Sequence, residues 1–275
     1  MLDTTMRVRH PAVAGSFYPG HTKSLQQEVQ RLLSAATRVD LPPVRGLIVP
    51  HAGYRYSGPV AASGFRQLAA SHPDCLPTVY LLGPAHYAPV DQVALAPYDR
   101  FDTPLGPVPQ NKQAMEGLLQ DQGVYRPQAQ PHAPEHCLEV ELPFLQTVLE
   151  DFDLVAMLCG TPSVGQVAAD LSRRLGPGDL VVVSSDLSHF YTYDQARALD
   201  RRFLEAVLAG DLDAAARGEA CGLRPILILM RLAQLRGWQP SLLDYRNSGD
   251  TGGDRRRVVG YAAVAYTEST AARPV

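Results

Sequence analysis

Four short runs of apolar residues along the middle of the chain constrain the fold more than any other feature. They cover residues 46–50, 78–83, 153–158 and 180–184. Runs that are apolar at nearly every position, rather than at alternate positions, are typical of strands buried on both faces of a parallel sheet. Amphipathic stretches precede and separate these runs, for example 23–36 before the first and 164–175 between the last two. This alternation predicts an α/β fold, with a mostly parallel central sheet between two helical layers in a three-layer α/β/α arrangement.

The remaining segments extend this pattern without a break. Further helices are expected over residues 57–70, 138–149, 194–208, 212–217 and 222–235. The Pro- and Gln-rich region 98–134 contains one further expected helix, at 112–120, and a short strand is expected at 93–97. Two strands at 241–246 and 258–267 flank a Gly-rich turn, which predicts an antiparallel pair. We therefore expect one domain with short flexible termini.

Composition and charge exclude several classes of protein. The 275 residues are 45% hydrophobic and 19% charged, as in an ordinary globular protein. The formal net charge of −3 provides no basic field for a nucleic-acid backbone. No apolar run approaches the length of a membrane helix, and the N-terminus has no apolar signal segment. Four cysteines without a C-x-x-C pair favour free thiols, with Cys75 and Cys159 in the core. We expect a cytoplasmic protein that binds neither nucleic acid nor membrane.

Three histidines follow three of the apolar runs. His51 and His86 come shortly after the runs at 46–50 and 78–83, and His189 follows the run at 180–184. Ligands of open α/β sheets bind beyond the carboxyl ends of the strands. A single histidine at such a place usually caps or hydrogen-bonds the backbone, whereas three at equivalent places favour a shared site. Because imidazole is both a common metal ligand and the usual acid or base near neutral pH, we expect a metal or catalytic site there.

Five weaker candidates each have a structural alternative. Cys221 opens a predicted helix, whose dipole favours a thiolate that could bind a metal, although a small buried residue also suits that place. His136 and Glu139 are three residues apart, which places them on one helix face, either supporting a site or capping the helix. Tyr54 and Tyr87 lie near the histidines and either line a pocket for an aromatic or peptide ligand or pack its rim.

Several motifs, taken together and in this order, resemble the Memo family. They are residues 10–19 (HPAVAGSFYP), 50–54 (PHAGY), 83–86 (GPAH), 135–139 (EHCLE), 184–189 (SSDLSH), 221–222 (CG) and 259–263 (VGYAA). The resemblance covers residues 8–267 and implies a single Memo-like domain. Bacterial members are labelled AmmeMemoRadiSam system protein B, after gene neighbours that include an AMMECR-like protein and a radical SAM protein. The resemblance thus also implies these two as partners.

The resemblance further implies a fold like that of class III extradiol ring-cleavage dioxygenases. Those enzymes bind non-haem Fe(II) through two histidines and a glutamate, with a further histidine as acid or base. By this resemblance, His51 and His86 are metal ligands, and Cys221 stands at the position of the glutamate. It also implies that His189 is the acid or base, and we expect Asp186 to set its orientation and basicity.

These observations lead to one main hypothesis and two alternatives. The main one is a redox enzyme that uses Fe(II), or Cu, on a small-molecule or peptide substrate. A histidine and cysteine ligand set suits Cu and Zn as well as Fe(II). The first alternative is a module that binds a peptide or a partner protein in a cleft derived from a dioxygenase. The second is a Zn-dependent hydrolase, in which a metal-bound water does the chemistry.

Overall fold

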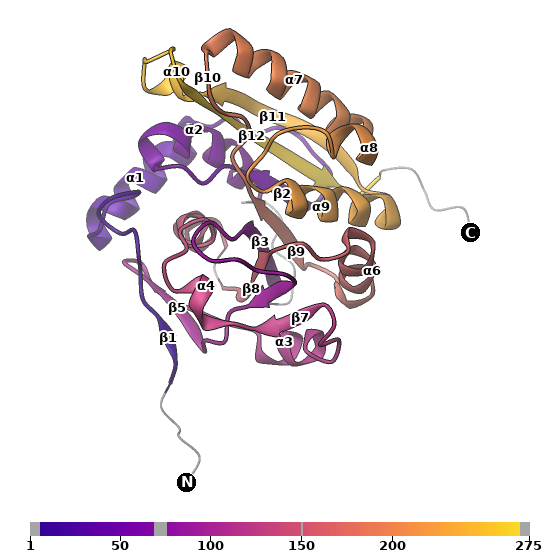
Figure 1. Ribbon diagram of the computed structural model, residues 1–275. Coiled ribbons are helices and arrows are strands. Elements are labelled where there is room, and N and C mark those ends of the chain that lie inside the picture. The colour runs from indigo at the N-terminus through magenta and orange to yellow at the C-terminus, as the bar shows by residue number, and fades with distance from the viewer. Residues whose placement is uncertain (1–5, 69–75, 150, 270–275) are drawn as a thin grey trace.

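The four apolar runs form adjacent parallel strands at the centre of a large sheet (Figure 1). The computed structural model describes residues 6–68, 76–149 and 151–269. In spatial order the central strands are β2 (Val44–Val49), β9 (Leu180–Ser184), β3 (Thr78–Pro84) and β8 (Asp153–Cys159). Every residue of β3 and β9 is buried, as expected for strands that are covered on both faces.

Antiparallel pairing extends this parallel centre on both sides. Beyond β2 lie β12 (Val258–Thr267), β10 (His189–Tyr191) and β11 (Gln239–Asn247). Strand β12 is antiparallel to β2, and β10 and β11 are both antiparallel to β12, which confirms the predicted C-terminal pair. The turn between β11 and β12 contains the short helix α10 (Ser248–Thr251). Beyond β8 lie β4 (Val93–Leu95), antiparallel to it, and β7 (Tyr125–Pro127), parallel to β4. The parallel pairing is therefore concentrated in the centre.

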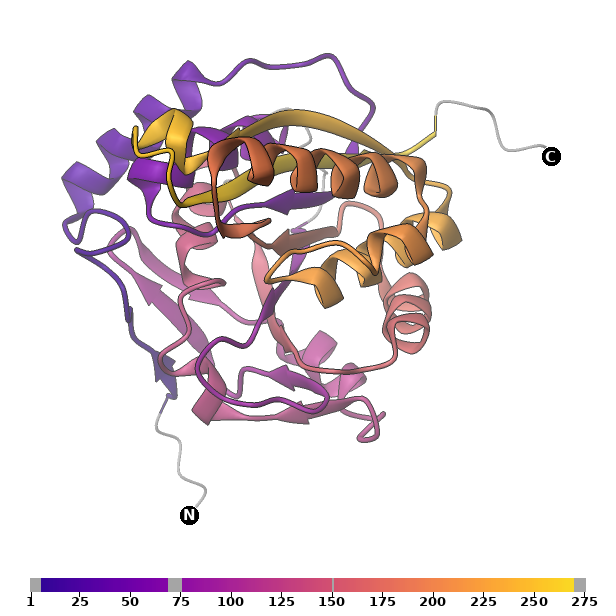
Figure 2. The same ribbon diagram turned by 45° about the horizontal axis from the view of Figure 1, so that its top comes forward.

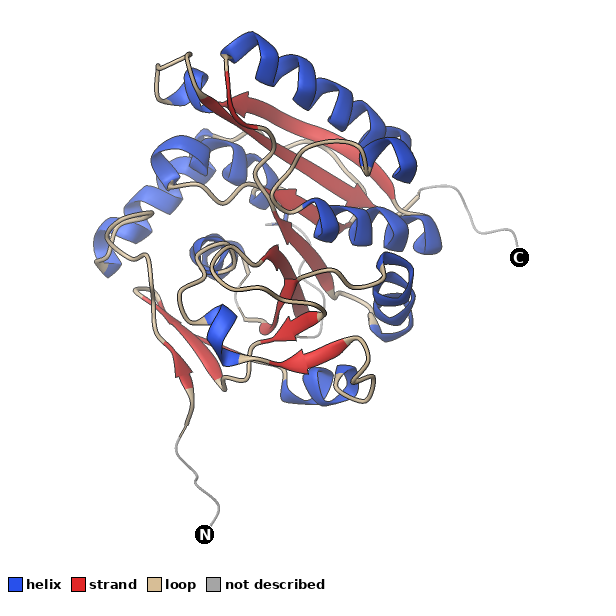
Figure 3. Cartoon of the chain, in the orientation of Figure 1, coloured by secondary structure: helices blue, strands red, loops and turns tan. Residues whose placement is uncertain are grey.

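Helices cover both faces of the sheet (Figure 3). On one face lie α1 (Thr22–Ala35), α2 (Tyr54–Phe65) and α5 (Leu142–Val148). On the other lie α3 (Lys112–Leu118), α6 (Val164–Arg174), α7 (Tyr193–Ala209), α8 (Leu212–Ala215) and α9 (Leu223–Arg236). In Figure 2, α7 crosses in front of the β11–β12 hairpin. Side chains of β3 alternate between the two cores, with Leu81 in the first and Leu82 in the second. The predicted three-layer α/β/α fold is confirmed.

A second, three-stranded sheet lies within the described ranges and was not predicted. It consists of β1 (Val8–Arg9), β5 (Arg100–Thr103) and β6 (Gly106–Pro109). These strands are two to four residues long, and β6 contains two prolines. Proline removes a backbone donor and is unusual inside a strand, so such short segments did not predict strands.

The predicted helix over residues 138–149 is divided into two parts. A 3₁₀ turn, η2 (Glu139–Glu141), leads directly into α5. Pro143 lies in the first turn of α5, where its missing N–H leaves no helical hydrogen bond unmade. The same proline therefore begins a new helix rather than interrupting a longer one.

Some predictions fall outside the described residues. They are the last two residues of the helix at 57–70, the core position of Cys75 and the flexible termini. Cys159 is buried as predicted, and Cys137, Cys159 and Cys221 are free thiols. No helix in the described part of the chain combines the length and apolar character needed to cross a bilayer.

His132, a buried histidine that does not follow one of the central strands, makes the stability of the fold depend on pH. His132 ends α4 (Ala129–His132), is 1% exposed and donates from Nε2 to the Ala94 carbonyl at 2.9 Å. Burial lowers the pKa of His132 from its usual 6.5 to about 4. Between these values the unfolded chain binds a proton that the folded chain does not. His132 therefore contributes stability above pH 6.5 that is lost as the pH falls toward 4.

This loss can be isolated with one substitution. The pKa difference corresponds to about 3 kcal/mol. In urea unfolding, the wild type should have a higher free energy of unfolding than His132→Gln at pH 6.5. We expect this difference to decrease by about this amount as the pH falls from 6.5 to 4. Substituting the exposed His21 by glutamine is the matched control and should leave the pH dependence unchanged. A constant difference between wild type and His132→Gln across this range would contradict the prediction.

Candidate metal centre

The carboxyl ends of the central strands bring three histidines together. His51 follows β2 and His86 follows β3, and their ring centroids are 5.2 Å apart. His136, from the loop before η2, completes the group, with its ring centroid 5.4 Å from that of His51 and 4.8 Å from that of His86. Potential ligand atoms of the three lie within 4.8 Å of one another. His51 and His86 therefore lie at one edge of the sheet, and the third ring of this cluster is His136 rather than His189.

His51 is held so that one ring nitrogen faces the site. The side chain is buried, and its Nδ1 lies 2.8 Å from Ser184 Oγ at the end of β9. Its Nε2 lies 3.2 Å from Cys221 Sγ. Burial, and then the neighbouring His136 and His86 rings, lower the pKa of His51 well below its usual value. The ring is therefore neutral at pH 7, which is the form that binds a metal.

A buried glutamate, Glu135, orients His86. Its carboxylate accepts hydrogen bonds from His86 Nδ1 at 2.9 Å, from the His86 backbone N–H at 2.7 Å and from the backbone N–H groups of His136 and Cys137. Burial raises the pKa of Glu135, but the bonds from His86 and Cys137 outweigh it and set the pKa at about 2. Metal-binding histidines commonly donate their second nitrogen to such a carboxylate. No role was predicted for Glu135, although it directly precedes His136 in the EHC motif.

Cys221 lies just before α9, beside His51. The Asp186 backbone N–H points at its Sγ, 3.2 Å away, and the Cys221 N–H donates to the Asp186 carbonyl. Burial, and then the Asp186 carboxyl, raise the pKa of Cys221 to about 12. The expectation that the helix start favours a thiolate is wrong for the metal-free chain, because burial outweighs the hydrogen bonds that lower the pKa, including that of the Gly222 backbone at the start of α9. At neutral pH Cys221 is a thiol that can donate to His51 Nε2.

Asp186 supports His51 rather than His189. Its buried carboxylate accepts a bond from the His51 backbone N–H at 2.9 Å, and burial raises its pKa to about 7. The expectation that Asp186 orients His189 is therefore wrong. The His189 backbone N–H donates to Glu219 Oε1 at 3.2 Å, and Glu219 Oε2 accepts from the Tyr191 hydroxyl at 2.8 Å. Burial lowers the pKa of His189.

Glu139 belongs to neither group of potential metal-ligand residues in the described part of the chain. It is buried and forms an ion pair with Arg9. Its carboxylate also accepts bonds from the Ala12 and Val13 backbone N–H groups and from the Tyr18 hydroxyl. Glu139 thus anchors the N-terminal segment, and the expectation that it shares a helix face with His136 is wrong because His136 precedes η2.

The two candidate tyrosines have different environments. Tyr54 is buried, packs against Phe144, and donates from its hydroxyl to the Val140 carbonyl at 2.6 Å. It therefore belongs to the core. Tyr87 is 55% exposed, and its hydroxyl lies 3.2 Å from His136 Nδ1, so it lies at the rim of the cluster.

The donor set fits a transition-metal ion. Nδ1 of His51 is hydrogen-bonded to Ser184, and Nδ1 of His86 is hydrogen-bonded to Glu135. Nε2 of each ring is therefore the available ligand atom. The 3.2 Å between His51 Nε2 and Cys221 Sγ is close to the separation of two ligands of one ion. Nitrogen and sulfur ligands suit Fe(II), Cu and Zn better than Mg²⁺ or Ca²⁺.

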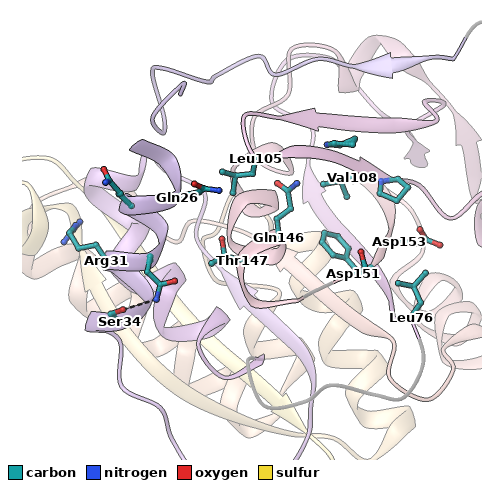
Figure 4. Close-up of a pocket in the computed structure, with 15 residues that line it drawn as sticks. Gln26, Arg31, Ser34, Leu76, Leu105, Val108, Gln146, Thr147, Asp151 and Asp153 are labelled. Atoms are coloured by element: carbon teal, nitrogen blue, oxygen red, sulfur yellow. Dashed lines mark hydrogen bonds between the residues drawn. The ribbon is translucent and has the colours of Figure 1, made fainter. Parts of the chain in front are cut away.

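A large pocket lies far from this cluster along the strands. Its volume is about 1030 Å³, and Figure 4 shows its lining from α1, α5 and the start of β8. Leu76 and Asp153 place it at the amino ends of β3 and β8, whereas the histidines follow the carboxyl ends. None of the histidines contributes to its lining. The pocket and the candidate metal centre are therefore separate features.

Comparisons with known proteins give the family. The family model described as Memo-like protein matches residues 9–265. A MEMO1 family protein of Ignicoccus hospitalis is 37% identical over 286 residues, covering 95% of this chain and 99% of the relative. One of Methanosarcina acetivorans is 35% identical, covering 94% and 99%. The crystal structure of an uncharacterised Escherichia coli K12 protein, 10% identical, shares the fold at a TM-score of 0.50, covering 81% and 99%. This chain is therefore a member of the Memo family.

Proposed function

We propose that this chain is a metal-dependent redox enzyme that holds one Fe(II) ion through His51, His86 and Cys221. The cluster of His51, His86 and His136, with Cys221 Sγ 3.2 Å from His51 Nε2, is the observation that carries the proposal. A bound Fe(II) ion would supply one-electron chemistry and open positions for O₂ or substrate. His136 stacks on His86 and offers a further nitrogen at the same place.

The surrounding residues have separate tasks in this proposal. Ser184 and Glu135 orient His51 and His86 by engaging their Nδ1 atoms. His189 is only partly buried, and its lowered pKa keeps the ring neutral at pH 7. It can therefore accept a proton from a bound substrate and later return it. Glu219 fixes the backbone of His189 and thus the position of this base.

Metal analysis of protein purified without oxygen tests the proposal. We expect about one iron per wild-type chain and almost none in the double variant His51→Ala/His86→Ala, because each of the two removes an imidazole ligand. His10→Ala/His21→Ala, at two exposed histidines, is the matched control and should retain the metal. Equal, near-zero iron and copper in wild type and double variant would refute the metal site. Zinc alone, with activity that persists without O₂, would favour a hydrolase instead.

Exposed aromatic side chains beside the site support a second candidate function. Tyr87 follows His86, and Phe190 and Tyr191 follow His189, and all three are exposed. We propose that they dock a peptide or a partner such as the AMMECR-like protein. Large aromatic side chains often anchor such contacts. Binding that survives His51→Ala/His86→Ala but is lost in Tyr87→Ala/Phe190→Ala would support this function, and loss in neither variant would oppose it.

A further inference from the structure

A buried carboxyl group, Glu141, lies behind the candidate metal centre. It is 1% exposed and ends η2, and its Oε1 is 2.9 Å from Ser184 Oγ. Within the described ranges, none of the ion pairs includes it. Among the described residues, three titratable groups interact electrostatically with Glu141, namely Tyr54 of α2, Cys137 and Asp186. None of the three is a cation. An ionised carboxylate without a cation is strongly disfavoured in such a place.

The hydrogen-bond distances of Ser184 indicate which neighbouring groups carry a proton. Its Oγ lies 2.6 Å from the Cys137 carbonyl oxygen, 2.9 Å from Glu141 Oε1 and 2.8 Å from His51 Nδ1. A hydroxyl donates one hydrogen bond and accepts two, whereas a carbonyl oxygen only accepts. The single Ser184 proton must therefore point to Cys137, the closest of the three. The other two neighbours must donate to Ser184, which requires a proton on Glu141 and one on His51 Nδ1.

The environment of Glu141 agrees with this proton count. Burial raises the pKa of Glu141 well above its usual value, and the Asp186 carboxyl adds to this, against a smaller opposite effect of the Ser184 hydrogen bond. A proton on His51 Nδ1 also leaves a lone pair on Nε2, facing Cys221. The burial of Glu141 and the 3.2 Å contact between Cys221 Sγ and His51 Nε2 both fit this distribution of protons.

We propose that Glu141 is a neutral carboxylic acid that acts as a positioning residue. It donates to Ser184 and so directs the Ser184 proton to Cys137, which leaves Ser184 free to accept from His51 Nδ1. His51 is thereby held in the tautomer that presents a lone pair on Nε2 to a metal. The protonation of Glu141 and the tautomer are properties of the metal-free chain, and only their effect on metal binding rests on the proposed function.

Two spectroscopic measurements on metal-free protein test the proposal. The infrared difference spectrum between wild type and Glu141→Gln at pH 7 should show the C=O stretch of one protonated carboxylic acid. Nitrogen-15 NMR of the His51 ring should show the Nδ1–H tautomer in wild type and in Glu141→Gln, whose amide can also donate to Ser184. Glu141→Leu removes the donor and should give a mixture of tautomers. A carboxylate signal for Glu141, or an unmixed tautomer in folded Glu141→Leu, would overturn the proposal.

Metal binding provides the link to function. Zn²⁺ titrated into the metal-free protein should bind about tenfold more weakly to Glu141→Leu than to wild type, and Glu141→Gln should restore most of the affinity. Equal affinity of wild type and Glu141→Leu would overturn the positioning role. If wild type itself does not bind Zn²⁺, the proposed metal site fails, while the spectroscopic results still decide the protonation of Glu141.

Discussion

Replacing Glu139 with alanine is expected to lower the free energy of unfolding by about 4 kcal/mol, because it leaves a charge buried without its partner. Arg9 and Glu139 are 2% and 1% exposed and form an ion pair. The same carboxylate accepts bonds from the backbone N–H groups of Ala12 and Val13 and from the Tyr18 hydroxyl. Alanine removes all of these acceptors at once. Urea unfolding followed by circular dichroism measures the loss.

Two further variants separate the buried pair from ordinary surface charge. Glu268 pairs with Arg45 but is half exposed, so Glu268→Ala should cost less than about 1 kcal/mol. The double variant Arg9→Met/Glu139→Leu removes both charges and should recover part of the stability lost in Glu139→Ala. A cost for Glu139→Ala no larger than that for Glu268→Ala would contradict the argument.

The sequence predicted the centre of the fold because its signal is local there. Each central strand is a run of residues that are apolar at nearly every position, and each corresponds to one largely buried strand. The order in which they pair, with β9 between β2 and β3, explains why His51 and His86 meet. The antiparallel flanks and the small sheet depend on pairing between distant short segments, such as β1 with β5, for which a single sequence carries little information.

The candidate site was predicted where residues follow strands and missed where distant loops meet. His51 and His86 have strong local signals, but the partner of His86 is Glu135, 49 residues away. The bond between Asp186 and the His51 backbone spans 135 residues, so proximity in sequence wrongly suggested His189 as the partner of Asp186. Buried polar groups find their hydrogen-bond partners through tertiary structure, and sequence spacing does not show which ones.

Substituting Glu135 by glutamine is expected to weaken metal binding about 100-fold, because the support of His86 is lost while the ligands themselves remain. The carboxylate receives one ring nitrogen and three backbone N–H groups, all of them donors. Glutamine has nearly the same shape and can keep Oε1 as an acceptor for the His86 ring, but it has no negative charge, and its NH₂ group replaces Oε2 and opposes the His86 backbone N–H. The His86 ring then donates to a neutral amide oxygen, which lowers its basicity as a ligand and holds it less firmly. Titration of metal-free protein with Zn²⁺ measures the effect.

Tyr87→Phe is the matched control, because it shows whether any small change near the histidine cluster weakens Zn²⁺ binding. Tyr87→Phe removes the hydroxyl that lies 3.2 Å from His136 Nδ1, but Tyr87 is 55% exposed and water can replace the bond. We therefore expect Tyr87→Phe to bind Zn²⁺ nearly as tightly as wild type. If folded Glu135→Gln also binds as tightly as wild type, His86 is not oriented through Glu135. The ring would then be held by its stacking on His136, at a centroid distance of 4.8 Å.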